Sequence, residues 1–266
     1  MIPQVPEAEL TERVTAMSSP ATIRRGDTHL AKKVLPLLEN GDTLDTREFL
    51  RRFERMPHVK KAELINGVVF MASPVRLLHA NPHSDLSYWL TTYRVATAGV
   101  RSPDNVTFKL TKRTAVQPDV MLYTEASLGG KSQASKRGYV IGSPELAAEV
   151  AASSVSLDAG PKREIYLEHG VAEYVLWRVE DEAIDWWTLR DGEYAAIEPD
   201  PADGLLKSVV YPGLWLDKGA MLRGEMPAVL AALHRGLASP EHAAFAAKLH
   251  PDAARGRGTL AGPADL

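Results

Sequence analysis

The sequence contains no cysteine among its 266 residues. A disulfide framework, a thiolate zinc site and a cysteine nucleophile are therefore excluded, and any bound metal must be held by oxygen or imidazole ligands. No run of about 18 apolar residues occurs, and the opening stretch MIPQVPEAEL has neither a basic region nor an apolar core. The sequence thus favours neither a membrane span nor a signal peptide, and we expect a cytoplasmic protein.

A large excess of positive charge is also absent, because the formal net charge is −3 at pH 7. This balance argues against a generally basic nucleic-acid-binding surface. A local excess does occur early in the chain, in the residues Arg24, Arg25, Lys32, Lys33, Arg47, Arg51, Arg52, Arg55, Lys60 and Lys61. Two interpretations stay open for these residues, a solvated helix face and a patch that faces phosphates.

The composition is that of a globular protein, with 45% hydrophobic and 24% charged residues. Apolar residues at helical spacing predict an amphipathic helix that begins near residue 43, with Thr43 or Asp45 as its N-cap. The pair Asn66-Gly67 predicts the turn of a β-hairpin, and Asp191-Gly192 predicts a second one.

Helical segments alternate with apolar strands in the middle of the chain. Helices are predicted over residues 79–98 and 156–170, the second with Ser156 or Asp158 as its N-cap. Antiparallel hairpins follow, so we predict an α/β fold with a mixed central β-sheet flanked by helices. This domain is expected over residues 43–224, between an N-terminal extension of residues 1–42 and a helical, partly disordered tail of residues 225–266.

Two carboxylates fall on apolar strands, Asp119 in VQPDVMLY and Glu149 in ELAAEVA. Neighbouring strands that each present one carboxylate at the same end form an oxygen-ligand site suited to Mg²⁺ or Mn²⁺. Pro-Asp pairs are also common at ordinary turn-to-strand junctions, and Glu149 would then occupy an exposed position. The apolar neighbours of Glu149 argue against exposure, because a buried carboxylate without a partner is costly.

Several segments in a fixed order resemble a known family. They are AELINGVVFMASP, HANPHSDLSYWL, VQPDVML, ELAAEVAASSVSLDAGPKREIYLEHGVAEYVLW and YPGLWLD. Over residues 43–222 the chain resembles the putative restriction endonuclease family, uncharacterised cyanobacterial-type nucleases of the PD-(D/E)XK nuclease superfamily. The resemblance implies a restriction-endonuclease-like core in which Asp119 and Glu149, with the backbone carbonyl of Val150, bind the metal.

The superfamily pattern has a lysine two residues after the glutamate, where this chain has Ala151. The resemblance implies that Lys162, on the next helix, replaces it, which the long and flexible lysine side chain permits. An exposed lysine at a helix start is the alternative interpretation of Lys162.

Other residues match family positions with smaller roles. Glu63 would be an auxiliary acid, or else an ordinary strand residue, and His79 would touch a phosphate or cap the helix, with His83 as its competitor. Gln117 and Tyr166 would contact the substrate from a strand and a helix.

The resemblance and the chemistry together predict magnesium- or manganese-dependent hydrolysis of DNA. Lys162 would orient or activate the attacking water, and the arginines of residues 47–55, with Lys131 and Lys136, would position the DNA backbone. A double-strand cut needs two sites, which favours a homodimer. Two alternatives stay open: an inactive nuclease fold that binds nucleic acid or protein, and a metal-free module whose Trp177, Trp186, Trp187 and Trp215 meet a partner.

Overall fold

The computed structural model describes residues 35–73 and 76–249, and the chain divides into two compact units, Met1–Pro36 and Leu37–Leu266. All elements named below belong to the second unit. Among the described residues, no helix is long and apolar enough to cross a membrane.

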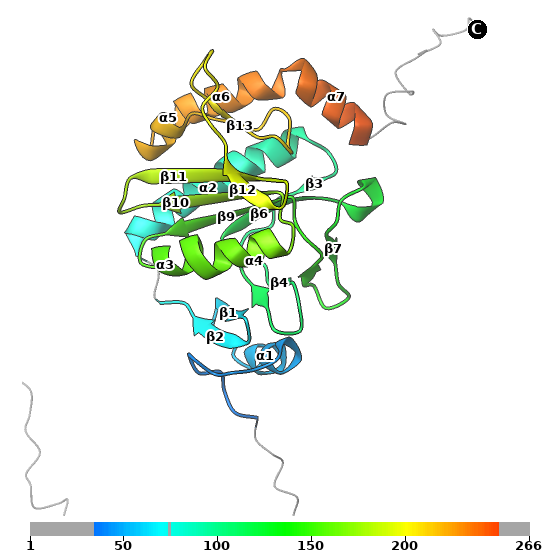
Figure 1. Cartoon of the computed structure of the whole chain (residues 1–266), viewed down its shortest axis with the longest axis vertical. Coiled ribbons are helices and arrows are strands. Elements are labelled where there is room, and N and C mark those ends of the chain that lie inside the picture. Colours follow the sequence, from blue (N-terminus) through cyan, green and yellow to red (C-terminus); the bar gives the residue numbers. More distant parts are fainter. Residues whose placement is uncertain (1–34, 74–75, 250–266) are drawn as a thin grey trace, which may run out of the picture. The chain divides into compact units, whose positions relative to one another are not determined.

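A six-stranded sheet forms the centre of this unit (Figure 1). Its strand order is β12 (Glu193–Ala196), β11 (Ala183–Arg190), β10 (Glu173–Arg178), β9 (Leu146–Ala151), β6 (Val120–Thr124) and β3 (Val100–Arg101). The pair β9 and β10 is parallel, and the other pairs are antiparallel. The predicted mixed α/β sheet is therefore confirmed.

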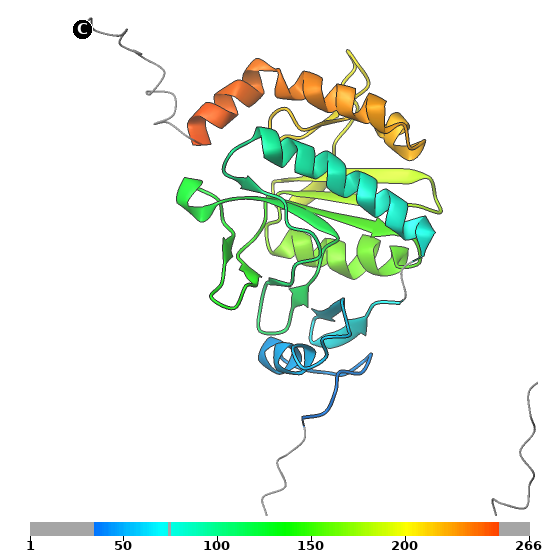
Figure 2. The same cartoon turned by 180° about the vertical axis from the view of Figure 1, so that it is seen from behind.

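Helices cover both faces of this sheet. One face packs against α2 (Leu77–Ala96), α5 (Lys218–Leu222), α6 (Met226–Leu237) and α7 (Pro240–Leu249), with α2 crossing the sheet directly (Figure 2). The other face packs against the helical segment α3 (Val155–Leu157), η3 (Asp158–Lys162) and α4 (Arg163–Glu168). Side chains of β9 alternate between the two cores, because successive strand residues point to opposite faces.

The same unit contains a second six-stranded sheet. Its order is β2 (Val68–Met71), β1 (Ala62–Ile65), β5 (Ala115–Val116), β4 (Phe108–Lys109), β8 (Val140–Ile141) and β7 (Gln133–Ala134). Helix α1 (Thr46–Phe53) packs its apolar side chains Phe49 and Leu50 with Leu64 and Val69 of this sheet. The remaining elements are η2 (Ala126–Leu128) and the ribbon of β13 (Leu206–Lys207) and β14 (Trp215–Leu216).

The local predictions about turns and the first helix are confirmed. Asn66 and Gly67 have φ values of 51° and 87°, and Asp191 and Gly192 have 51° and 85°, as two-residue hairpin turns require. Asp45 is the N-cap of α1, where its side chain accepts a hydrogen bond from the Glu48 amide.

The predicted domain limits at residues 42 and 224 stay predictions. Residues 1–34 and 250–266, which include most of the expected extension and the part of the tail that the sequence predicts to be disordered, lie outside the described residues. Helices α6 and α7 begin after the predicted limit, and Val229, Leu233 and Leu249 lie in the same core as α2.

The tryptophans serve mainly as packing residues. Trp177 and Trp186 are buried in the core between the sheet and α2, while Trp187 and Trp215 are half-buried. Trp187 stacks on Tyr174 with the ring centroids 5.6 Å apart. This arrangement gives no continuous exposed aromatic surface of the kind that the partner-binding alternative needs.

Candidate metal and nuclease site

Asp119 and Glu149 come together because β6 pairs with β9 in antiparallel register. Val120 lies opposite Ala148, so continuing the register by one residue places Asp119 opposite Glu149. Strand alternation directs both side chains to the sheet face that α4 covers. Both are almost fully buried, with 2% and 1% exposed. The alternative interpretation, in which Glu149 is exposed, is therefore wrong, and the argument against exposure is confirmed.

Asp119 is held as a carboxylate by three donors. The Val150 amide donates to Oδ2 at 2.8 Å, the Lys61 ammonium lies 2.7 Å from Oδ1, and the His79 Nε2 atom lies 3.3 Å from Oδ2. Burial by itself would raise the pKa of Asp119, but His79, Lys61 and the Val150 amide outweigh it and hold this pKa well below its ordinary value. Asp119 is thus ionised at neutral pH and ready to bind a cation.

The pKa of Glu149 is shifted in the opposite direction to that of Asp119. Its Oε1 atom lies 2.6 Å from the Lys162 ammonium and accepts a hydrogen bond of 2.7 Å from the Tyr166 hydroxyl, while Oε2 lies 3.9 Å from the Lys61 ammonium. Burial raises the pKa of Glu149 above its ordinary value, although Lys162 and Lys61 both oppose this shift. The two lysines therefore compensate the charge of Glu149 incompletely.

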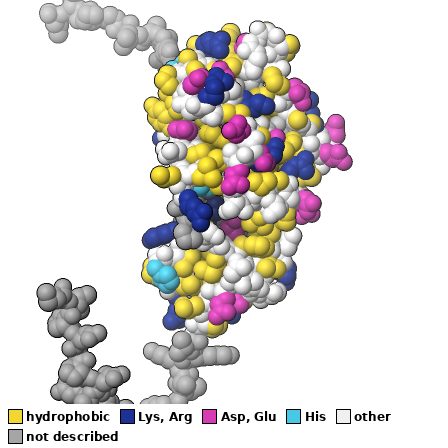
Figure 3. Space-filling view, turned by 90° about the vertical axis from the view of Figure 1, so that its left-hand side faces the viewer, with side chains coloured by type: hydrophobic (Ala, Val, Ile, Leu, Met, Phe, Trp, Pro, Cys, Tyr) yellow, Lys and Arg dark blue, Asp and Glu magenta, His cyan; other side chains and the backbone are white. Residues whose placement is uncertain are grey.

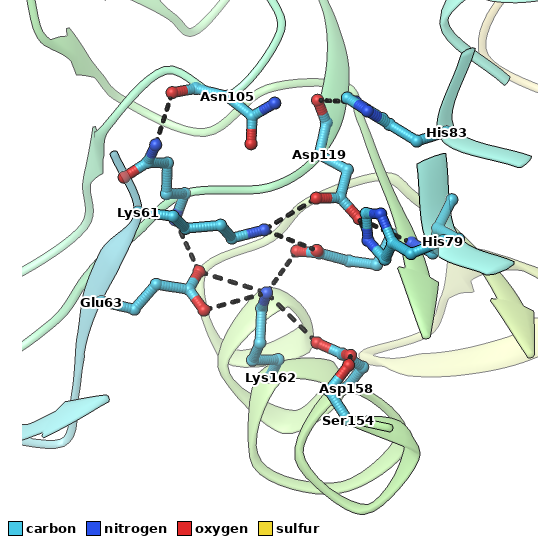
Figure 4. Close-up of polar contacts among 12 residues, drawn as sticks. Lys61, Glu63, His79, His83, Asn105, Asp119, Ser154, Asp158 and Lys162 are labelled. Carbon is cyan, nitrogen blue, oxygen red and sulfur yellow. Dashed lines mark hydrogen bonds and ion pairs between the residues drawn. The ribbon is translucent and has the colours of Figure 1, made fainter. Parts of the chain in front are cut away.

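Lys162 is the centre of the buried acidic cluster (Figure 4). Its side chain is 1% exposed, and its ammonium lies 3.1 Å from Glu63, 2.6 Å from Glu149 and 3.2 Å from Asp158. Burial lowers the pKa of Lys162, but these carboxylates raise it to well above its ordinary value. The exposed-lysine interpretation is wrong, and Lys162 is a fixed buried cation beside Glu149.

The local backbone places Lys162 in this position. Gly160 has φ −103° and ψ −105°, outside the helical region, and Pro161 follows it, so the chain kinks just before α4. The predicted N-cap at Ser156 or Asp158 is wrong because the helical segment already begins at Val155. Instead, the Asp158 carboxylate is buried and accepts a hydrogen bond of 2.5 Å from the Ser154 hydroxyl.

Glu63 and Gln117 join the cluster from the second sheet. Glu63 is 5% exposed, and its Oε1 accepts a 2.6 Å hydrogen bond from the backbone amide of Gln117. The side-chain nitrogen of Gln117 donates to the carbonyl oxygens of Lys60 at 3.0 Å and Asn105 at 2.8 Å. Gln117 therefore connects the segments around Lys60 and Asn105 next to Asp119. Its predicted contact with substrate stays a prediction, as does that of Tyr166.

Both histidines predicted as competitors lie at the site, and they differ in what they contact. His79 faces the Asp119 carboxylate, whereas the His83 Nε2 atom lies 3.3 Å from the Asp119 backbone oxygen and 3.4 Å from the Asp104 carboxylate. The His79 Nδ1 atom is buried and has no hydrogen-bond partner among the described residues. His79 thus contacts the Asp119 carboxylate, while His83 contacts the backbone of the same residue and the Asp104 carboxylate.

The donor set fits a hard divalent cation. Asp119 and Glu149 both direct an oxygen toward one point, which the Lys61 ammonium takes in this structure. Within residues 35–73 and 76–249, no group of three or more acidic or histidine side chains is arranged to hold a metal alone. Two carboxylates, completed by backbone, water and substrate oxygens, are nevertheless a common way of binding Mg²⁺.

Comparison with models of protein families identifies the family of this chain. Residues 48–219 match the model of the Uma2 family, which is described as "Putative restriction endonuclease". The chain belongs to this family. The matched region is most of the chain and includes every site residue described above, so the resemblance recognised from the sequence is confirmed.

A solved structure also resembles the chain. It is described as a putative nuclease belonging to DUF820 from Anabaena variabilis ATCC 29413, with 13% sequence identity and a TM-score of 0.48, and the match covers 69% of this chain and 98% of that one. No curated protein matches this chain.

Within this Uma2 chain, the sequence reasoning missed two members of the site, Lys61 and Asp158. Lys61 belongs to a run of basic residues, and the sequence predicts Asp158 as a helix cap. A signal for Lys61 was nonetheless available, because it lies two residues before Glu63 and strand alternation directs both to one face.

Proposed function

We propose that this chain is a magnesium- or manganese-dependent endonuclease that hydrolyses DNA phosphodiester bonds, with Asp119 and Glu149 as its metal ligands. The observation that carries the proposal is the opposition of these two buried carboxylates, which direct their oxygens at one cation position. Membership of a family described as "Putative restriction endonuclease" supports the same chemistry.

Asp119, Glu149 and the backbone carbonyl of Val150 would hold the cation, and Glu63 would assist, directly or through water. A bound divalent ion supplies polarisation of the phosphoryl oxygen and a lower pKa for a coordinated water. Val150 contributes to this arrangement already, because its amide fixes the orientation of the Asp119 carboxylate.

Lys162 would provide a permanent positive charge. Because its pKa is held well above the ordinary value, it keeps its proton and is unsuited to act as a general base. Its buried ammonium would orient the attacking water and stabilise the negative charge that develops on the phosphoryl group. Tyr166, which donates to the Glu149 carboxylate, would fix the orientation of this ligand.

The substrate would be recognised mainly through its backbone. His79, which is half-buried beside Asp119, would contact a phosphate at the site. Arg47, Arg55, Lys131 and Lys136 are exposed and available for more distant phosphates, whereas Arg51 and Arg52 already pair with Glu48. On the face shown in Figure 3, charged residues of both signs alternate with apolar ones, so we expect moderate, sequence-independent affinity for DNA.

The direct test is cleavage of supercoiled plasmid with Mg²⁺ or Mn²⁺. Asp119→Asn should lower the rate by at least about a hundredfold, since it removes a ligand charge while conserving shape. Asp181→Asn, which changes an exposed acid that pairs with Arg178, is the matched control and should leave the rate unchanged. Cleavage in the presence of excess chelator, or by Asp119→Asn at the normal rate, would overturn the proposal.

The same experiment distinguishes the nuclease from the main alternative. If the protein cleaves no DNA and calorimetry shows no metal binding, an inactive nuclease fold that binds nucleic acid or protein becomes the better account. A measurement of molecular mass in solution, in the presence of DNA, tests separately whether the expected homodimer forms.

A further inference from the structure

Lys61 places a second cation in the site, in addition to Lys162. It immediately precedes β1, and its ammonium lies 2.7 Å from Asp119 and 3.9 Å from Glu149. These are the two carboxylates that converge at the cation position. Of the two lysines, Lys61 is the one that contacts both of these acids.

The two lysines differ in how firmly they are held. Lys162 is 1% exposed and surrounded by three carboxylates, whereas the Lys61 side chain is 23% exposed and reaches the acids from the side of β1 (Figure 4). A lysine side chain is long and flexible, so a partly exposed one can turn toward solvent. Lys61 can therefore leave the carboxylates without unpacking the core, and Lys162 cannot.

The charges of the cluster also favour a cation with a higher charge than an ammonium group. Its members are the carboxylates of Glu63, Asp119, Glu149 and Asp158 and the ammonium groups of Lys61 and Lys162. The formal surplus is two negative charges, which one divalent ion would neutralise. With Lys61 in place, an incoming ion meets a positive charge at the position it needs.

We propose that the Lys61 ammonium occupies the divalent-cation position between Asp119 and Glu149 and is displaced when the metal binds, so that Lys61 sets the metal affinity of the site. The inference rests on the metal site of the proposed function, and it holds whether or not the protein cleaves DNA. Lys61 keeps the paired carboxylates compensated in the absence of metal, and the metal must compete with it.

Isothermal titration with Mn²⁺ tests this competition. Lys61→Met should bind Mn²⁺ roughly tenfold or more tightly than the unchanged protein, because a repelling charge only a few ångströms away is removed. Lys61→Arg keeps the charge and should bind close to the unchanged protein. Lys60→Met is the matched control, since Lys60 is exposed and its ammonium donates to the Pro57 carbonyl, and it should leave the affinity unchanged.

A second measurement covers the case in which Lys61→Met is unstable. Without metal, its melting temperature should fall below that of Lys60→Met, and Mn²⁺ should raise it by more than it raises the melting temperature of the unchanged protein. If Lys61→Met does not fold without metal, recovery of folding by Mn²⁺ supports the proposal, and failure to recover overturns it.

The outcomes distinguish this inference from the proposed function. If the unchanged protein binds Mn²⁺ and Lys61→Met binds it equally or more weakly, the proposed role of Lys61 is overturned and the metal site is not. Absence of Mn²⁺ binding in all the variants overturns both proposals. Tighter binding by Lys61→Met without any DNA cleavage supports the competition and rejects the nuclease.

Discussion

Two buried glutamates on neighbouring parallel strands, Glu149 on β9 and Glu173 on β10, are compensated in different ways. Glu149 is compensated by the ammonium groups of Lys162 and Lys61 and by the Tyr166 hydroxyl. Glu173 is fully buried at the opposite end of the strand pair, and no cation contacts it among the described residues. The contrast separates a buried carboxylate that contacts cations from one that neutral donors satisfy.

Glu173 is satisfied by neutral donors alone. Its carboxylate accepts hydrogen bonds from Trp186 Nε1 at 3.1 Å, the Ser208 hydroxyl at 2.8 Å and the amides of Val209 and Val210 at 2.7 Å and 3.1 Å. Such donors are fixed by the fold and fill the acceptor positions of the carboxylate. Glu173 therefore fastens the segment before β14 to the sheet, whereas Glu149 faces the ammonium groups of Lys162 and Lys61.

The largest stability effect is expected from Lys162→Met. The change leaves three buried carboxylates without their shared cation, and breaking a buried ion pair in this way costs about 3–5 kcal/mol. Urea denaturation in the presence of chelator measures the loss. The control Lys207→Met removes a half-buried lysine that pairs with Asp200 and should change stability little. A loss below about 1 kcal/mol for Lys162→Met would contradict the central place of Lys162 in the cluster.

A pH dependence of nearly the same size is expected from Glu173. Burial raises the pKa of Glu173 to about 7, against the opposing effect of its four hydrogen bonds, so the folded state binds the proton more tightly than the unfolded state. Its contribution to the free energy of unfolding is therefore complete below about pH 4.5 and is lost as the pH rises to about 7, a change of about 3 kcal/mol.

Glu173→Gln isolates this contribution. The difference in unfolding free energy between the unchanged protein and Glu173→Gln should fall across that pH range, as measured by urea titrations at several pH values. Parallel stability curves for the two proteins would show that Glu173 does not bind a proton on folding.

Tyr166→Phe and Ser208→Ala provide a smaller, paired comparison. Each removes one hydroxyl donor to a buried glutamate, Tyr166 to Glu149 and Ser208 to Glu173, and each should cost about 1 kcal/mol of stability. Only Tyr166→Phe should also slow plasmid cleavage, because only Glu149 is a proposed metal ligand. Equal cleavage rates for the two variants would remove the distinction between the two glutamates.

Much of this arrangement was predictable from local sequence patterns. The hairpin turn at Asn66-Gly67 follows from backbone preference, and the pairing of Asp119 with Glu149 was inferred from two apolar strands that each hold one carboxylate. The turn and each of the two strands are signalled within a few residues, where propensity and alternation decide the structure.

The remaining features depend on contacts between distant segments. The sequence presents Lys61 as one more basic residue, whereas the fold brings its ammonium to Asp119, 58 residues away. Aspartate is a common residue type at helix N-caps, but the Asp158 carboxylate contacts Lys162 across the kink at Gly160 instead. No pattern in the sequence indicated that Glu173 is buried, because its donors Val209 and Val210 come from a loop.

The most direct test compares the initial rates of plasmid cleavage of Glu149→Gln and Glu173→Gln with Mg²⁺, at a pH where both variants are folded by circular dichroism. The two changes are chemically identical and fall on adjacent strands. Glu149→Gln should lower the rate by at least about a hundredfold, and Glu173→Gln should change it by less than about threefold. Normal cleavage by Glu149→Gln, or equal losses in both variants, would contradict the assignment of the site.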